Sequence, residues 1–292
     1  MGEKRGKNGG KTGEKGGKKK ETQQETGNKK KKSSASGVHL KAYVDEGVAM
    51  SSRYRALKTC RNPLDLSSVQ VKKLHNWKLT PAEAVQLQKK LASKIRFIHI
   101  KREPKLVAGL DCAFTKDGSK IVACAVVMTM PDFKVIEIKT AKQKIAFPYV
   151  PGLLSFRESP ACIAAVEKLN SSPDLFIVDG QGFAHPRRFG IASHLGLFFD
   201  KPTIGCAKSR LIGDYEDPPP QKGAYSLLKD KGETIGAVVR TRTNVKSVFV
   251  SVGNNCTLED AIKFTLACCT KYRIPEPSRL AHQLVTKAKL HA

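Results

Sequence analysis

Apolar and polar positions along the chain first become regular near Trp77. Thr80-Pro81-Ala82-Glu83 forms a capping box with proline at the first helical position. Leu87, Leu91 and Ile95 then recur four residues apart, which is the spacing of one helix face. The pattern therefore predicts an amphipathic helix that begins at about residue 81.

Strand patterns follow this helix. Residues 106–112 and 121–130 are largely apolar, and Lys116-Asp117-Gly118-Ser119 between them is a hairpin signal. A Pro131-Asp132 turn then leads into residues 134–140. We expect these three runs to form a three-stranded meander.

The second half of the chain alternates helical and strand patterns. Helices are expected at 161–169, where Ser159-Pro160 supplies a start, at 190–199, at 257–272, and from the Pro275-Glu276-Pro277 break towards Lys289. Strands are expected at 174–178 and 202–206, with an antiparallel pair at 234–240 and 247–252. A meander followed by βα units predicts an α/β fold with a mixed central sheet flanked by helices.

Composition changes this picture mainly at the N-terminus. The 292 residues include 52 Lys and Arg against 26 Asp and Glu, a net charge of +26. Residues 1–37 hold 12 of the basic residues and 4 Glu, and they have no apolar residues that could anchor a core. We expect a disordered basic tail at 1–37, a poorly defined lead-in at 38–76 and one folded domain at 77–290.

The charge and the cysteines limit the function classes. A strongly basic chain suits a polyanionic partner, with nucleic acid first and an anionic membrane surface second. The longest apolar run, 121–130, is well short of the roughly 20 residues that a membrane span needs, and no signal peptide precedes it. Eight cysteines without metal-site spacing indicate a reducing compartment. We expect an intracellular, cytoplasmic protein, or a nuclear one in a eukaryote.

Two acidic residues occur where such a sheet presents its active sites. Asp111 closes the strand expected at 106–112, and Asp179 closes the one at 174–178. A buried carboxylate is costly unless it is paired or holds a cation, and a divalent metal relieves the repulsion between two of them. Mg²⁺ fits because it takes few carboxylates and keeps waters. The alternatives are a basic partner for Asp111 and a turn role for Asp179.

Two loops add further candidates. The loop after Asp179 concentrates glycine, histidine and arginine before a helix, a composition suited to phosphate; its candidates are Gly180, Gly182, His185, Arg187 and Arg188, whereas His194 suits a packed helix histidine. The loop at 147–152 is stiffened by prolines and presents an aromatic side chain that can replace a displaced base; its candidates are Tyr149, Pro151, Gly152 and Leu153. Packing of Tyr149 under a turn is the alternative.

Three more side chains can act on a phosphate. Glu158 follows the proline-rich loop and can complete a metal site directly or through water, although it also suits a helix start. Lys208 follows the strand at 202–206 and can stabilise developing charge, unless it is only solvated. His282 shares a helix face with Arg279 and can orient a water, although spacing alone favours a solvated histidine.

Five separated blocks of these residues resemble the endonuclease V family. They are the Gly109-Leu110-Asp111 strand end, Phe147 to Gly152 with Ser155-Phe156-Arg157-Glu158, Asp179 to His194, Gly205 to Ser209, and Ile274-Pro275-Glu276-Pro277 with Arg279 and His282. The resemblance is collinear from Trp77 to about Lys289, and residues 1–75 lie outside it.

The resemblance implies an RNase H-like fold and a catalytic domain at 77–290. It implies Mg²⁺-dependent cleavage of the second phosphodiester bond 3′ to a deaminated adenine, leaving 3′-hydroxyl and 5′-phosphate ends, with Mn²⁺ as a substitute metal. Asp111, Asp179 and Glu158 take the metal positions, Lys208 and His282 the remaining catalytic positions, and Tyr149 the strand-separating wedge. Hypoxanthine recognition falls to the backbone of 152–154 and 180–183.

Other functions stay open at this stage. An inosine-specific endoribonuclease differs only in its tolerance of a 2′-hydroxyl, which no spacing reveals. A non-catalytic basic nucleic-acid-binding protein would need no paired acids, and a junction-selective nuclease of the same fold would ignore the base. The leading expectation is a monomeric DNA-repair endonuclease that acts on deoxyinosine in DNA, with inosine RNA as a second partner and no membrane.

Overall fold

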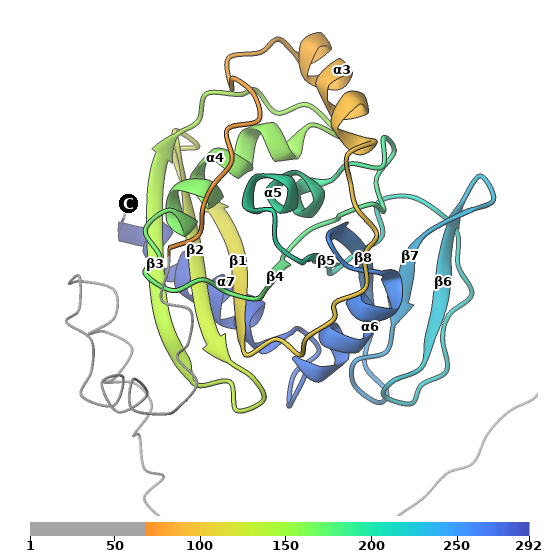
Figure 1. Ribbon diagram of the computed structural model, residues 1–292. Coiled ribbons are helices and arrows are strands. Elements are labelled where there is room, and N and C mark those ends of the chain that lie inside the picture. The colour runs from red at the N-terminus through yellow and green to blue at the C-terminus, as the bar shows by residue number, and fades with distance from the viewer. Residues whose placement is uncertain (1–67, 292) are drawn as a thin grey trace, which may run out of the picture. The chain divides into compact units, whose positions relative to one another are not determined.

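A computed structural model describes residues 68–291 (Figure 1). The expected tail at 1–37 and most of the expected lead-in lie outside these residues. One eight-stranded mixed sheet forms the centre, in the order β3-β2-β1-β4-β5-β8-β7-β6. The strands are β1 (Leu106–Phe114), β2 (Lys120–Thr129), β3 (Val135–Lys144), β4 (Leu175–Val178), β5 (Thr203–Ala207), β6 (Tyr225–Asp230), β7 (Glu233–Val239) and β8 (Val248–Asn254).

Strand direction determines where the functional side chains gather. β1, β4 and β5 are mutually parallel, so their carboxyl ends share one edge of the sheet. β2 and β3 complete the expected antiparallel meander, and β7 and β8 form the expected antiparallel pair. The outermost strand, β6, was not expected; its exposed residues alternate with partly buried ones and with the fully buried Leu228 beside β7.

Helices cover both faces of the sheet. α4 (Leu154–Val166) and α5 (Ile191–Phe199) bury one apolar cluster against β1, β2 and β4, and α3 (Pro81–Ala92) lies beyond them in Figure 1. α6 (Leu258–Ala267) and α7 (Glu276–Ala288) bury a second cluster on the other face, and a 3-10 turn, η1 (Lys289–His291), follows. The expected α/β class with a mixed sheet flanked by helices is confirmed.

Several expected boundaries were wrong, including the end of β3, which continues to Lys144 rather than stopping at residue 140. α4 begins at Leu154 rather than at residue 161, so Pro160 lies inside the helix. Burial of Phe156 and Ala161 on that helix outweighs the hydrogen bond that Pro160 cannot donate. β1 continues to Phe114, which places Asp111 inside the strand rather than at its end, and α6 ends at Ala267 rather than near residue 272.

The last residues of the expected lead-in are part of the fold. Val69 is buried among the residues under α4 and α5, and Lys72 N–H donates to the carbonyl of Phe198 at 2.7 Å. Val69 and Lys72 therefore contact the helices of the expected catalytic domain, and the start of that domain at residue 77 stays a prediction. Among residues 68–291, no helix combines the length and apolar content that a membrane crossing requires.

Candidate active site

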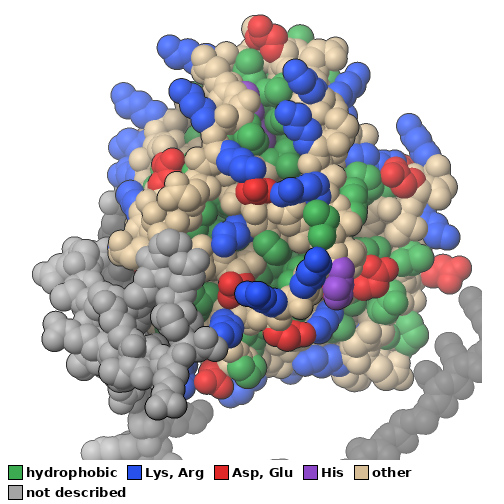
Figure 2. Space-filling model, in the orientation of Figure 1, with side chains coloured by type: hydrophobic (Ala, Val, Ile, Leu, Met, Phe, Trp, Pro, Cys, Tyr) green, Lys and Arg blue, Asp and Glu red, His purple; other side chains and the backbone are tan. Residues whose placement is uncertain are grey.

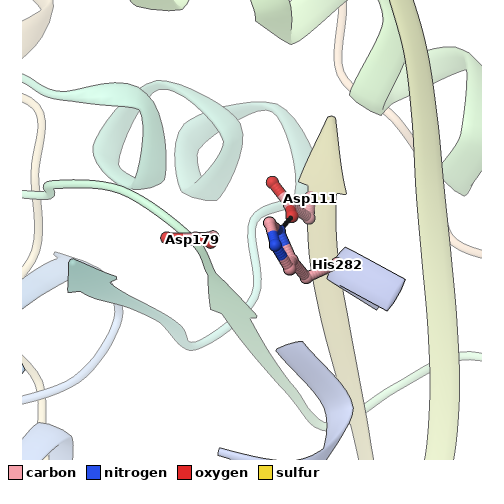
Figure 3. A group of neighbouring side chains, drawn as sticks. All are labelled: Asp111, Asp179 and His282. Carbon is pink, nitrogen blue, oxygen red and sulfur yellow. Dashed lines mark hydrogen bonds and ion pairs between the residues drawn. The ribbon is translucent and has the colours of Figure 1, made fainter. Parts of the chain in front are cut away.

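Three side chains converge at the edge where the parallel strands end. Asp111 from β1, Asp179 directly after β4 and His282 from α7 each offer one ligand atom, and these atoms lie within 4.8 Å of one another (Figure 3). Asp179 N–H donates to the carbonyl of Leu110 at 3.0 Å, which continues the parallel pairing and sets Asp179 beside Asp111. The group could hold a metal ion.

Hydrogen bonds orient the two carboxylates. His282 Nδ1 donates to Asp111 Oδ2 at 2.6 Å, and Cys112 N–H donates to Asp111 Oδ1 at 2.8 Å. Lys208 Nζ donates to Asp179 Oδ2 at 2.5 Å, and Arg273 Nη2 holds the Lys208 carbonyl at 2.9 Å. The expected residues Asp111, Asp179, Lys208 and His282 therefore form one connected cluster.

A glycine in β1 lets α7 reach this cluster. A Cβ atom on Gly109 would lie 2.1 Å from the carbonyl carbon of Pro277, in the first turn of α7. Ser278 Oγ also donates to the carbonyl of Ile177 in β4 at 3.2 Å. The helix therefore begins in direct backbone contact with the sheet, and His282, one and a half turns later, faces Asp111.

Glu158 is buried close to the cluster but outside the group of three. The pKa of Glu158 is raised to about 7, mainly by burial and then by the Asp111 and Asp179 charges, while a hydrogen bond from the Cys112 thiol opposes the rise. Burial and the Asp179 charge likewise raise the pKa of Asp111, although His282 and the Cys112 amide oppose this. Three carboxyl groups thus share a site that lacks enough positive charge, which a divalent cation would supply.

The raised pKa of Glu158 gives a stability prediction. An ordinary glutamate has a pKa of 4.5, so folding favours the protonated form, and this stabilisation is lost as pH rises from 4.5 to about 7. In EDTA, the unfolding free energy of the wild type should fall by about 3 kcal/mol relative to Glu158→Gln between those pH values. Denaturant unfolding at several pH values measures this difference.

Glu167→Gln is the matched control, because Glu167 caps the same helix and is exposed. It should keep the pH dependence of the wild type. Parallel pH curves for the wild type and Glu158→Gln would contradict the assigned protonation of Glu158.

A second group of residues builds the loop at 147–152. Tyr149 is 71% exposed, whereas Phe147 and Leu153 on either side are buried. Gly152 adopts φ +77°, and its carbonyl accepts hydrogen bonds from Arg187 Nη2 at 2.6 Å and Gln88 Nε2 at 3.1 Å. The structure therefore brings Gly152 and Arg187 together and leaves the Tyr149 ring free in solvent.

Gln88 is a functional candidate that the sequence reading missed. It is fully buried on α3, donates to the Phe189 carbonyl at 2.6 Å and accepts from Arg187 Nε. The sequence did contain a signal for this role, because Gln88 is a polar residue on the helix face that also carries Ala84 and Leu91. Gln88 and Arg187 connect the loop at 147–152 to the loop that follows Asp179.

The glycines after Asp179 allow close backbone contacts. Gly182 N–H donates to Ser251 Oγ at 2.9 Å, and a Cβ atom there would lie 2.2 Å from the Val252 carbonyl oxygen. Gly180 has φ +154° and packs against Ile191. The loop therefore lies directly on the sheet, which fixes the backbone groups beside the carboxylates.

The remaining loop candidates have partners within the fold. His185 is buried and its Nδ1 accepts from the Arg187 amide at 3.2 Å; burial, then the Arg187 charge, lower its pKa to about 4. The Arg188 guanidinium pairs with Asp230 at 2.8 Å and Glu233 at 2.6 Å in the β6–β7 turn. Neither side chain joins the carboxylate cluster, and their roles in substrate binding stay predictions.

His194 is a packed helix histidine, as expected. It is fully buried on α5 among aromatic rings, and its Nε2 lies 2.8 Å from Nε2 of His75. This contact also fixes part of the expected lead-in against the core.

Comparison with known proteins agrees with this geometry. A family model described as Endonuclease V matches residues 89–283. The endonuclease V of Methanothrix thermoacetophila is 49% identical over 214 residues, which cover 73% of this chain and 94% of that relative. The crystal structure of the Streptomyces avermitilis endonuclease V is 40% identical with a TM-score of 0.71, covering 77% of this chain and 99% of the other.

The chain belongs to the endonuclease V family.

Family membership confirms the resemblance carried by the five sequence blocks, together with the expected enzyme class, a deoxyinosine-directed endonuclease. An endonuclease V from Ciona intestinalis was solved in complex with a 24mer DNA containing an inosine followed by a ribo-adenosine. It is 32% identical, with a TM-score of 0.63 over 72% of this chain and 98% of the other.

Proposed function

We propose that this endonuclease V hydrolyses the second phosphodiester bond 3′ to a deaminated adenine in DNA, leaving a 3′-hydroxyl and a 5′-phosphate, in DNA repair. The observation that carries the proposal is the cluster of Asp111, Asp179 and His282 at the edge of the sheet. The bound inosine-containing DNA of the Ciona relative supports the substrate class.

Mg²⁺ is the metal that the donor set fits best, with Mn²⁺ as a substitute. Asp111 and Asp179 would hold it through carboxylate oxygens, which are hard ligands, and Glu158 would contact it through water. The raised pKa values of Asp111 and Glu158 support this fit, since both arise mainly from burial and from the charges of neighbouring carboxylates, which a cation would offset. When held there, Mg²⁺ would supply Lewis-acid chemistry, lowering the pKa of a bound water and offsetting charge on the phosphate.

The chain's own residues would perform the other steps. Lys208 would exchange its bond to Asp179 for the charge that develops on the phosphate. His282, half exposed and held by Asp111, would orient the attacking water towards the phosphorus. The Asp111 hydrogen bond keeps the Nδ1 proton of His282 in place, which leaves Nε2 for that water.

Base recognition would use the two loops described above. Glycines at 152, 180 and 182 bring backbone groups close to one another, and Gln88 with Arg187 holds the Gly152 carbonyl in position. Hypoxanthine presents an oxygen where adenine has an amine. Backbone N–H groups at 152–154 and 180–183 would donate to that oxygen and exclude the amine. Tyr149 would fill the gap that the displaced base leaves.

Tyr149→Ala should weaken binding of a deoxyinosine duplex by about 1–3 kcal/mol, the usual value of one aromatic stack on a base. The unfolding temperature should stay near that of the wild type, because the ring is 71% exposed. Fluorescence anisotropy in EDTA measures the binding. Tyr272→Ala is the control, since Tyr272 is also exposed, at 50%; an equal loss in both variants would contradict the wedge role.

Inosine-containing RNA is the second candidate substrate, because the complex of the Ciona relative carries a ribo-adenosine after its inosine. Matched DNA and RNA strands with one inosine, one adenine control of each kind, and assays with and without Mg²⁺ test the proposal. We expect a cut in deoxyinosine DNA, dependent on Mg²⁺, between the first and the second nucleotide on the 3′ side of the lesion. Cleavage of the RNA alone would assign the second function, and binding without any product would exclude both.

A further inference from the structure

Three lysines share a sheet face with Asp111. In the register of the meander, Asp111 pairs with Cys124, which pairs with Thr140. Two residues further along, Val122 pairs with Lys142, and two further still Lys120 pairs with Lys144. Directly paired residues and every second residue lie on one face, so Lys120, Lys142 and Lys144, here called the hairpin lysines, lie on the same face as Asp111.

The pairing of Lys120 with Lys144 is unfavourable for the isolated fold. Like charges directly opposite on neighbouring strands destabilise a sheet. Lys142 and Lys144 are exposed, Lys120 is partly exposed, and none of the three forms an ion pair with the residues at 68–291. Lys116 in the adjoining turn adds a further positive charge, and Asp117 there is the one carboxylate, already bonded to Thr115 and Ser119. A local excess of positive charge that finds no partner among residues 68–291 suits an external polyanion.

The hairpin lysines lie along the strands between Asp111 and the loop that carries Tyr149. Successive rows on one face are about 7 Å apart, so the lysines follow the Asp111 row at about 7 and 14 Å along the strands. Ile145 N–H donates to the Ser119 carbonyl at 3.2 Å, which ties the end of β3 to the turn, and Tyr149 follows five residues after Lys144. Lys and Arg side chains crowd the margin of the molecule beside the upper end of β3 (Figure 2).

We propose that the hairpin lysines bind the sugar–phosphate backbone of the substrate where it passes between the metal cluster and the Tyr149 loop. The inference rests on the proposed function and assigns a surface of the meander to it. Ammonium groups on long side chains bind phosphates without reading the sequence, so the contact adds affinity and not base selectivity.

The test is a salt titration of binding with Lys120→Gln/Lys142→Gln/Lys144→Gln. The control, Lys101→Gln/Lys105→Gln/Lys134→Gln, removes three exposed lysines at the opposite edge of the sheet and changes the net charge equally. Anisotropy in EDTA, from about 50 to 200 mM salt, is read with a deoxyinosine duplex and an adenine duplex. We expect the slope of log K against log salt to flatten by about 2–3 in the first variant, as for three lost phosphate contacts, and to change little in the control.

Several outcomes would overturn the proposal. An unchanged slope would mean that the lysines only keep the edge strand, β3, from pairing with another protein. An equal change in the control would mean that the effect comes from net charge and not from this surface. Lys120→Arg/Lys142→Arg/Lys144→Arg should keep the wild-type slope, and a flattened slope there would also contradict phosphate binding. The salt slope measured on the adenine duplex tests phosphate binding by the hairpin lysines even if the protein does not prefer deoxyinosine. If the wild type binds the two duplexes equally, that result contradicts the proposed function and not the role of the lysines.

Discussion

Asp111→Asn should reduce cleavage of deoxyinosine DNA by about 1,000-fold, equivalent to about 4 kcal/mol of transition-state stabilisation. Asp111 is the central member of the cluster, because it accepts from His282 at 2.6 Å and from the Cys112 amide at 2.8 Å while facing Asp179. Asparagine keeps the shape but offers a neutral oxygen on one side only. It would therefore weaken the metal site and also release His282 from its fixed tautomer.

Stability distinguishes this effect from misfolding. Burial and Asp179 both raise the pKa of Asp111, so removing its charge relieves repulsion in the metal-free protein. The thermal midpoint of Asp111→Asn in EDTA should match or exceed that of the wild type, while Mg²⁺ should no longer raise it. Asp132→Asn, which removes an exposed carboxylate from a turn, should cleave normally. Cleavage by Asp111→Asn within tenfold of the wild type would contradict its role.

Regular patterns predicted much of the fold, and exceptions to them produced the errors. Apolar runs separated by turn residues predicted the meander and the β7–β8 pair correctly, because antiparallel strands joined by short turns depend on neighbouring residues in the sequence. α4 did not, since Pro160 is usually read as a helix start and here lies within the helix. The early start matters to function, because it places Glu158 inside a buried helix turn rather than at its exposed end.

The candidate site was predicted from residue types, and its connections were not. Carboxylates at the ends of strands indicated Asp111 and Asp179, and parallel pairing brings them together. Spacing alone favoured a solvated His282; its side chain is indeed 52% exposed, yet it also holds Asp111. Gln88 and Cys112 contact the site through tertiary packing, which a linear pattern of polar positions does not contain.

Gly109→Ala should have the second large effect, although Gly109 bears no functional group. The added Cβ atom would lie 2.1 Å from the carbonyl carbon and 2.3 Å from the carbonyl oxygen of Pro277, so α7 would have to move away from β1. Overpacking of this kind costs about 3 kcal/mol, or about 6–12 °C in thermal midpoint. Because α7 carries His282, a displacement of about 1 Å should also reduce cleavage by about 100-fold.

Gly232→Ala separates this packing effect from the general cost of replacing glycine. Gly232 has φ +81° and open space where a Cβ would lie, so its variant should lose about 1 kcal/mol through backbone strain and cleave normally. Differential scanning calorimetry and single-turnover cleavage of both variants give the comparison. A Gly109→Ala protein with the stability and cleavage rate of the wild type would show that α7 does not need this contact to hold His282 against Asp111. If cleavage instead falls by more than the loss of stability explains, Gly109 acts by allowing α7 to lie where His282 reaches Asp111.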